Sequence, residues 1–224
     1  VIADVMPAAL ARLAGAGLPG PYARGLRRYR PGPPTLKVDW ALAGPIPWRS
    51  PEARLAGTVH VGGSESELLA GSRGAPSPTP FMLLGQQSLA DRTRAPAGGH
   101  TAWAYTHSAA DSARGLGAED VTRMEAAVER LAPGFGALIL ARHVLAPADL
   151  QARNRNLVAG DVGGGSYALD QLVFRPGASL IPYRTPVRGL YLGSAATFPG
   201  AAVHGVCGRA AARLALAEAR LRRI

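Results

Sequence analysis

The sequence has a single cysteine, Cys207, among its 224 residues. One thiol excludes an internal disulfide framework, a dithiol redox centre and a cysteine-based metal cluster within the chain, and it fits a reducing compartment. Long hydrophobic runs are also missing: no stretch approaches the roughly 20 apolar residues that span a bilayer, and the first residues lack the basic start of a secretory signal. We therefore expect a soluble, cytoplasmic protein without a metal site.

Lysine is equally scarce, because the basic side chains are 24 arginines and Lys37, against 15 acidic residues. The resulting formal charge of +10 is typical of a surface for nucleic acid or for an anionic membrane. The arginines, however, are spread from Arg12 to Arg223 rather than gathered into one run. A compositional bias of the source genome explains them as well, so we expect no nucleic-acid partner, while peripheral membrane contact is left open.

The middle of the chain carries four segments with strand character. Apolar and polar residues alternate over 36–42, 57–61 and 101–105, and 80–85 is a short apolar run bounded by breakers. Helices are expected at 8–14, after Ser64, at about 118–131 and at 147–153, while 135–144 fits either a strand or a buried helix. These patterns predict an α/β chain whose central part is α+β, with a mixed, largely antiparallel sheet and flanking helices.

One glycine motif is misleading. Residues 15–20 satisfy the letters G-x-G-x-x-G of a dinucleotide site. The fingerprint must leave a strand and enter a helix, yet the preceding segment has helical character, and Pro19 and Pro21 interrupt the segment where a helix would have to begin. We therefore interpret 15–35, rich in glycine and proline, as an irregular linker.

The segment 189–211 is the most informative part of the chain. It reads as a short strand at 190–192, a turn of small residues, and a helix from about 201 to 221. Gly193 permits a tight turn, and Gly200 and Gly205 keep side chains away from the start of the helix, so that a diphosphate or a planar ring could approach its amides. Tight packing of the helix on a sheet explains the same glycines equally well.

This segment resembles the carboxyl-terminal flavin-binding segment of the phytoene dehydrogenase-related NAD(P)/FAD-dependent oxidoreductases, within the carotenoid desaturase and FAD-linked amine oxidase superfamily. The family pattern is G-L-Y-L, small residues, P-G-G, V-H-G, G and A-A, and the chain matches it at 189–192, 199–200, 203–205, 208 and 210–211. Ala201 stands where the family often has a second glycine. Similar segments follow the family's order over nearly the whole chain, at 37–42, 45–48, 85–88, 95–96, 103–107, 132–135, 160–164, 174–176 and 183–186.

The resemblance implies FAD as the cofactor and assigns residues to it. Gly193, Ser194 and Ala195 would meet the ribityl or diphosphate part of FAD. A second group would lie near the isoalloxazine ring and the start of the helix: Pro199, Gly200, Val203, His204 and Gly205.

The resemblance also implies three segments. Residues 1–15 would be a strand and short helix of the FAD domain, 16–184 the substrate-binding domain, and 185–224 the strand, turn and helix that return to the FAD domain. The amino-terminal βαβ unit of that partial Rossmann-like domain has no counterpart here, and the chain opens without methionine. We expect the amino-terminal FAD-binding half to lie in the same longer protein or in a partner chain, and the chain alone to bind FAD weakly or not at all.

The resemblance predicts a dehydrogenase or desaturase that transfers hydride from an apolar or amphipathic small molecule to flavin. Trp103, Tyr105 and Phe174 are candidates for lining the substrate, although a place in the core of the sheet is the role that we favour for them. No catalytic residue is identified; the candidates are His204, at the start of the final helix, and His107. The alternative function is a non-catalytic interaction or assembly protein derived from such a domain.

Overall fold

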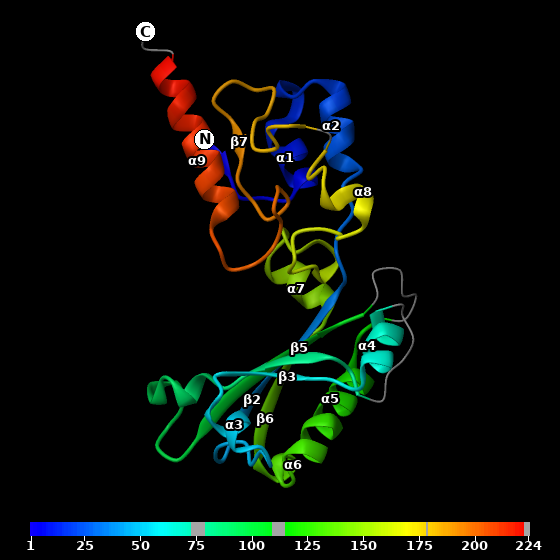
Figure 1. Ribbon diagram of the computed structural model, residues 1–224, viewed down its shortest axis with the longest axis vertical. Coiled ribbons are helices and arrows are strands. Elements are labelled where there is room, and N and C mark those ends of the chain that lie inside the picture. The colour runs from blue at the N-terminus through cyan, green and yellow to red at the C-terminus, as the bar shows by residue number, and fades with distance from the viewer. Residues whose placement is uncertain (73–78, 109–114, 178, 222–224) are drawn as a thin grey trace. The chain divides into compact units, whose positions relative to one another are not determined.

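The computed structural model describes residues 1–72, 79–108, 115–177 and 179–221. The chain forms two compact units (Figure 1). One consists of Val1–Pro33 together with Gln151–Ile224, here called the terminal unit, and the other of Pro34–Leu150, here called the sheet unit.

The sheet unit is built on five strands in the order β3-β4-β5-β2-β6, with every neighbouring pair antiparallel. The strands are β2 (Thr35–Leu42), β3 (Thr58–Val61), β4 (Met82–Gly85), β5 (His100–His107) and β6 (Ile139–Leu145). The four strands expected from the sequence are confirmed. The ambiguous segment 135–144 contains both alternatives, since the short helix α6 (Phe135–Leu138) leads directly into β6.

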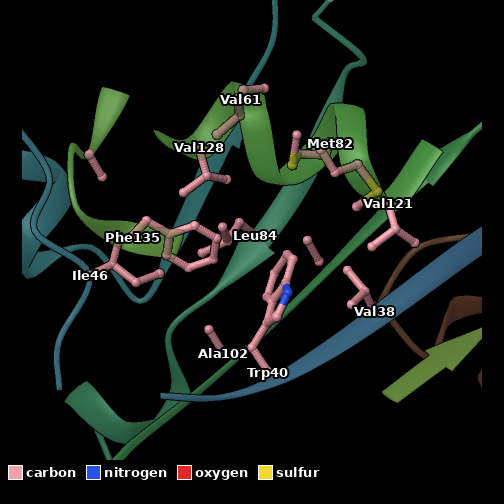
Figure 2. Close-up of a cluster of buried hydrophobic side chains, with 14 of the residues drawn as sticks. Val38, Trp40, Ile46, Val61, Met82, Leu84, Ala102, Val121, Val128 and Phe135 are labelled. Carbon is pink, nitrogen blue, oxygen red and sulfur yellow. The ribbon is translucent and has the colours of Figure 1, made fainter. Parts of the chain in front are cut away.

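The core of this unit lies between one face of the sheet and the helix α5 (Ala118–Leu131) (Figure 2). Alternation along β2 places Leu36, Val38, Trp40 and Leu42 on that face, all nearly inaccessible to solvent. The Trp40 and Phe135 rings meet edge to face, with centroids 5.4 Å apart. Apolar periodicity in the sequence therefore predicts both layers of this core.

Two further helices belong to the sheet unit, namely α3 (Pro51–Leu55) and α4 (Glu65–Ser72), whereas α7 (Pro147–Arg153) spans the division of the chain after Leu150. The predicted cap of α4 is confirmed. The Glu67 amide donates to Ser64 Oγ over 3.4 Å, and the Ser64 amide donates to the Glu67 carboxylate over 2.7 Å. This reciprocal arrangement satisfies two amides that the first helical turn leaves without partners.

The terminal unit contains a two-stranded parallel sheet, in which β1 (Ile2–Ala3) pairs with β7 (Tyr191–Leu192). Its helices are α1 (Pro7–Ala14), α2 (Gly20–Arg27), α8 (Leu169–Leu172) and α9 (Val206–Leu221). β7, the turn after it and α9 form the strand, turn and helix expected at the carboxyl end. Two strands from opposite ends of the chain are thus neighbours in one parallel sheet.

The linker predicted at 15–35 is wrong over Gly20–Arg27, which forms α2. Pro21 lies in the first turn, where its missing amide costs nothing. Ala23 and Leu26 are buried against Leu10 of α1, and this burial outweighs the poor helix propensity of glycine and proline. Residues Gly15–Gly17 form a single 3₁₀ turn directly after α1, so the G-x-G-x-x-G letters do not follow a strand.

The units divide the chain after Pro33 and after Leu150, whereas the boundaries assigned from the sequence fall after 15 and after 184. Residues 16–33 and 151–184 pack with the two ends of the chain. The reason is a set of hydrogen bonds between these segments, among them the Gly32 amide to Asp161 (2.7 Å) and the Tyr29 hydroxyl to the Gly164 carbonyl (2.8 Å). The roles assigned to the three sequence segments stay predictions.

Phe135→Ala tests the core of the sheet unit. Phe135 is fully buried against Trp40, so its removal leaves a cavity and should lower the free energy of unfolding by about 3–5 kcal/mol. Chemical denaturation monitored by tryptophan fluorescence measures the loss. Phe81→Ala is the matched control, because that ring is 45% exposed and should lose much less. Equal losses in the two variants would contradict the core as described.

Glu129→Gln tests the connection between α5 and α6. The carboxylate of Glu129 accepts the amides of Gly134 (2.7 Å) and Gly136 (2.8 Å), and these hydrogen bonds lower its pKa from the ordinary value of 4.5. The stability that the Glu129 carboxylate contributes to the fold is therefore fully present when the pH is above its ordinary pKa. This contribution is lost as the pH falls through the lowered pKa. The substituted amide does not titrate, so the variant's stability should fall less steeply in acid. Parallel curves of unfolding free energy against pH would contradict this.

Candidate functional site

The predicted cofactor segment begins at Gly193, directly after β7. Its amide donates to the Ala3 carbonyl over 2.9 Å, which extends the pairing with β1. A Cβ at this position would lie 2.8 Å from the Ile2 side chain and 3.3 Å from the Ala211 methyl group of α9. Close packing of β1, β7 and α9 therefore accounts for this glycine.

The next residues form a compact turn. Ser194 is buried; its hydroxyl accepts the Ala196 amide (3.3 Å), and its carbonyl accepts the amide and the hydroxyl of Thr197 (2.9 and 2.8 Å). Ala195 contacts the glycine loop 160–165, because a Cβ on Gly164 would lie 2.7 Å from the Ala195 methyl group. The sequence indicates both motifs, and the structure brings them together.

The predicted start of the final helix is wrong by five residues, because α9 begins at Val206 rather than near 201. The intervening backbone is not helical: Gly200, Ala202 and Gly205 have φ angles of 109°, 149° and 64°. His204 is exposed, and its Nδ1 accepts the Val206 amide over 3.0 Å. This hydrogen bond caps α9 and requires Nδ1 to be unprotonated.

A buried side chain of α9 also contacts the turn that precedes this helix. Cys207 is buried, and its Sγ lies 3.6 Å from the carbonyl oxygens of Thr197, Phe198 and Gly200. The other side of the segment is open, with Val203 fully exposed. The segment therefore offers backbone and small side chains to a ligand from its outer side.

Arg175 is the residue of this region that sequence reasoning missed, although the run Phe174, Arg175, Pro176 carries part of the family resemblance. The side chain is fully buried. Nε and Nη2 donate to the Tyr29 hydroxyl (3.0 and 2.6 Å), and Nη2 also donates to the carbonyls of Gly164 and Gly165 (2.9 and 3.2 Å). The guanidinium carbon lies 4.9 Å from the centre of the Tyr167 ring. Burial in this cluster raises the pKa of Tyr29, and the positive charge of Arg175 opposes that shift.

A buried carboxylate shapes the glycine loop under Arg175. Asp161 Oδ2 accepts the amides of Gly32 (2.7 Å) and Gly165 (2.6 Å), and Oδ1 accepts the amide of Gly163 (2.6 Å). Three backbone donors thus converge on one side chain from two distant segments. The carboxylate fixes the carbonyls of Gly164 and Gly165 where Arg175 can reach them.

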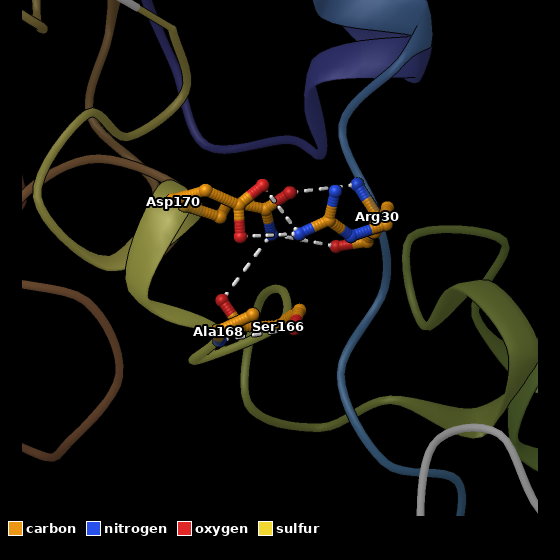
Figure 3. A network of polar contacts seen from close by, with 5 residues as sticks. Arg30, Ser166, Ala168 and Asp170 are labelled. Carbon is orange, nitrogen blue, oxygen red and sulfur yellow. Dashed lines mark hydrogen bonds and ion pairs between the residues drawn. The ribbon is translucent and has the colours of Figure 1, made fainter.

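Figure 3 shows a more exposed polar network of the terminal unit, which includes Arg30, Ser166 and Asp170. The Arg30 guanidinium donates to both carboxylate oxygens of Asp170, at 2.7 and 2.8 Å, and this hydrogen bonding lowers the pKa of Asp170. Gln171 accepts the Arg30 amide (2.9 Å) and donates to the carbonyls of Arg30 (2.8 Å) and Ser166 (3.2 Å). The network ties α8 and the end of the glycine loop to the segment after α2.

The other candidates lie in the sheet unit, apart from Phe174. His107 ends β5 and is exposed, with its Nδ1 3.0 Å from the Thr35 hydroxyl. Trp103 and Tyr105 are half-buried on the face of β5 opposite the core, with stacked rings 5.8 Å apart, whereas their neighbours Ala102 and Ala104 are in the core. The core role considered for these two rings is therefore wrong. Phe174 belongs to the terminal unit and is 53% exposed.

Around Gly200 the residues present fit an oxygen-rich part of a cofactor such as FAD. Gly200 is buried, and a Cβ there would lie 2.8 Å from Arg175 Nη1, a nitrogen that has no hydrogen-bond partner among the described residues. A donor without a partner, next to a residue without a side chain, suits an oxygen-rich ligand.

The described ranges contain no group of three His, Cys, Asp or Glu side chains that could hold a metal ion. Nor does any helix in them combine the length and apolar character that a membrane span requires.

Comparison with solved structures defines the class of fold. The chain is similar to a crystal structure of an oxidoreductase from Methanosarcina mazei, with a TM-score of 0.50 and 15% identity, over 96% of this chain and 42% of that one. This likeness supports a mixed α/β fold in which an antiparallel five-stranded sheet is flanked by helices.

Comparison with curated proteins is more specific. The chain is 31% identical to "Pyridine nucleotide-disulfide oxidoreductase domain-containing protein 2" of Rattus norvegicus and of Mus musculus, over 88% of this chain. It spans 37% of the length of those relatives. No protein-family model matches the chain.

Asp161→Asn tests the organisation of the glycine loop. An asparagine can offer its oxygen to Gly32 and Gly165, but its amide group then faces the Gly163 amide, donor against donor. The free energy of unfolding of the terminal unit should fall by about 2 kcal/mol, as for a buried polar group left without its partner. Denaturant titration measures it. Asp170→Asn, at the exposed pair with Arg30, is the control and should change little. An unchanged free energy of unfolding in Asp161→Asn would contradict the dependence of the loop on this carboxylate.

Proposed function

We propose that this chain is the carboxyl-terminal portion of an FAD-dependent oxidoreductase of the phytoene dehydrogenase-related kind. One observation carries the proposal: the segment 193–205, rich in glycine and alanine, lies between the parallel pair β1–β7 and the start of α9, and its Gly200 lies against the buried guanidinium of Arg175. The names of the relatives support the assignment to the oxidoreductase class.

In this proposal the loop holds the flavin end of FAD. Gly193, Ser194 and Ala195 lie toward the ribityl and diphosphate part, and Gly200 and Gly205 leave room beside the ring. The chemistry that bound FAD supplies is the acceptance of a hydride from a substrate carbon. The positive end of the α9 dipole and the nearby arginine favour electron density at the cofactor.

The amino-terminal half of the FAD site would come from the remaining part of a longer protein or from a partner chain. The coverage of 37% of the relatives supports this. So does the size of the sheet in the terminal unit, because two strands of two residues each are too small to be stable as a parallel sheet by themselves. Ile2 of β1 is 43% exposed and suits the packing of a further strand.

The substrate is proposed to be apolar or amphipathic and to lie on the aromatic face of the sheet unit. Trp103 and Tyr105 stack there, and the Trp103 ring also lies over Gly85 of β4, where a Cβ would come within 2.5 Å of it. His107 packs edge to face against Tyr105 at the end of this row, with centroids 5.2 Å apart. A flat aromatic surface with a polar group at one end suits an amphipathic molecule.

The cofactor can be tested by comparing two preparations. The native protein from its source should show a larger intact mass than residues 1–224 and a flavin absorbance that corresponds to one FAD per chain or complex. Purified residues 1–224 should bind FAD far more weakly than the native protein does. A native protein free of flavin would overturn the FAD proposal and favour the non-catalytic assembly protein, whereas tight stoichiometric binding by residues 1–224 would overturn the need for a second half.

A further inference from the structure

Arg175 carries a positive charge that its direct contacts do not balance. The acceptors around the guanidinium are the Tyr29 hydroxyl and the carbonyls of Gly164 and Gly165, all of them neutral groups. The side chain is fully buried, and arginine does not lose its proton in proteins. A buried charge without an ionic partner is costly, so the site favours an additional anionic or electron-rich acceptor.

The position for that acceptor is defined by Nη1. The other two nitrogens are already engaged with acceptors, and Nη1 alone has no partner among the described residues. It faces Gly200, where a Cβ would lie 2.8 Å away. Tyr167 contacts both Arg175 and the segment that follows Gly200. Its ring lies against the Arg175 guanidinium, and its hydroxyl accepts the Ala201 amide over 3.0 Å. The free donor therefore points at the segment that precedes α9.

We infer that Arg175 Nη1 is a built donor site for an anionic or electron-rich oxygen of a ligand bound against residues 200–205. The identification of this ligand as FAD rests on the proposed function, but the donor site itself rests on the geometry. Two parts of FAD offer such an oxygen: the carbonyl edge of the isoalloxazine ring and the diphosphate. The φ of Gly200, 109°, favours glycine, and the missing side chain also keeps a Cβ from lying 2.8 Å from Nη1. Tyr29 and Asp161 position the guanidinium.

Selective ¹H–¹⁵N spectra of the arginine side chains of residues 1–224 test this inference, with the Arg175 signals assigned by their loss in Arg175→Lys. Three probes are titrated to millimolar concentration: FAD, riboflavin and inorganic pyrophosphate. We expect FAD to shift the Arg175 signals. A shift with riboflavin assigns the acceptor to the ring or its ribityl chain, and a shift with pyrophosphate assigns it to the diphosphate. Arg175→Lys should lower the affinity for the effective probe on the order of tenfold, as expected for one charge-assisted hydrogen bond.

Two further variants complete the test. Gly200→Ala keeps Arg175 but places a methyl group against Nη1, and it should weaken the effective probe as well. Because a φ of 109° disfavours alanine, the fold of this variant is first compared with the wild type by its backbone amide spectrum. Arg188→Lys, at an exposed arginine of the same unit, is the matched control and should bind like the wild type. The inference is overturned if no probe moves the Arg175 signals, or if FAD binds with equal affinity to wild type and Arg175→Lys. Equal affinity of the wild type and Arg175→Lys for FAD would leave the proposed flavin function standing. Conversely, a native protein that lacks flavin, but whose Arg175 signals respond to pyrophosphate, would refute the flavin function and support the donor site.

Discussion

The carboxylate of Asp161 is the interaction on which the terminal unit depends most. It gathers three backbone amides, from Gly32 after α2 and from Gly163 and Gly165 in the glycine loop. Those segments are separated by 129 residues in the sequence. The small apolar core of the unit lies elsewhere, among α1, α2 and β7 residues such as Leu10, Leu26 and Leu192. At this point a polar group therefore joins distant segments, as a hydrophobic core does in the sheet unit.

The consequence of that carboxylate is the fixed position of Arg175. Once Asp161 sets the loop, the carbonyls of Gly164 and Gly165 turn toward the guanidinium, and Tyr29 completes its set of acceptors. Each partner is neutral and rigidly held, so the charge is oriented without being neutralised. The sheet unit is organised in the opposite way, by a continuous apolar layer from Leu36 to Phe135 with polar groups at its margins.

This contrast explains what could be predicted from the sequence. Strands β2 to β5 and the helix α5 follow from apolar periodicity, because alternation and helical spacing record directly which side faces a core. The sequence also predicts the strand, turn and helix at the carboxyl end. The contacts of Asp161 and Arg175 leave no such trace, since a single polar residue makes bonds with backbone groups far along the chain, and backbone groups carry no sequence signal. α2 escapes prediction for a related reason: burial of Ala23 and Leu26 against α1 overrides the local preference of its glycines and prolines.

The glycines after β7 have different explanations. At Gly193 the neighbours are Ile2 and Ala211, apolar groups of β1 and α9, and packing is a sufficient reason. Gly164 and Gly165 likewise abut Ala195 and Tyr29. Gly200 has a φ of 109°, which by itself favours glycine, and the atom against it is a charged nitrogen without a hydrogen-bond partner among the described residues. Packing thus accounts for the glycine at the beginning of the segment and backbone conformation for the one at its end, whereas the buried nitrogen beside Gly200 is explained by neither.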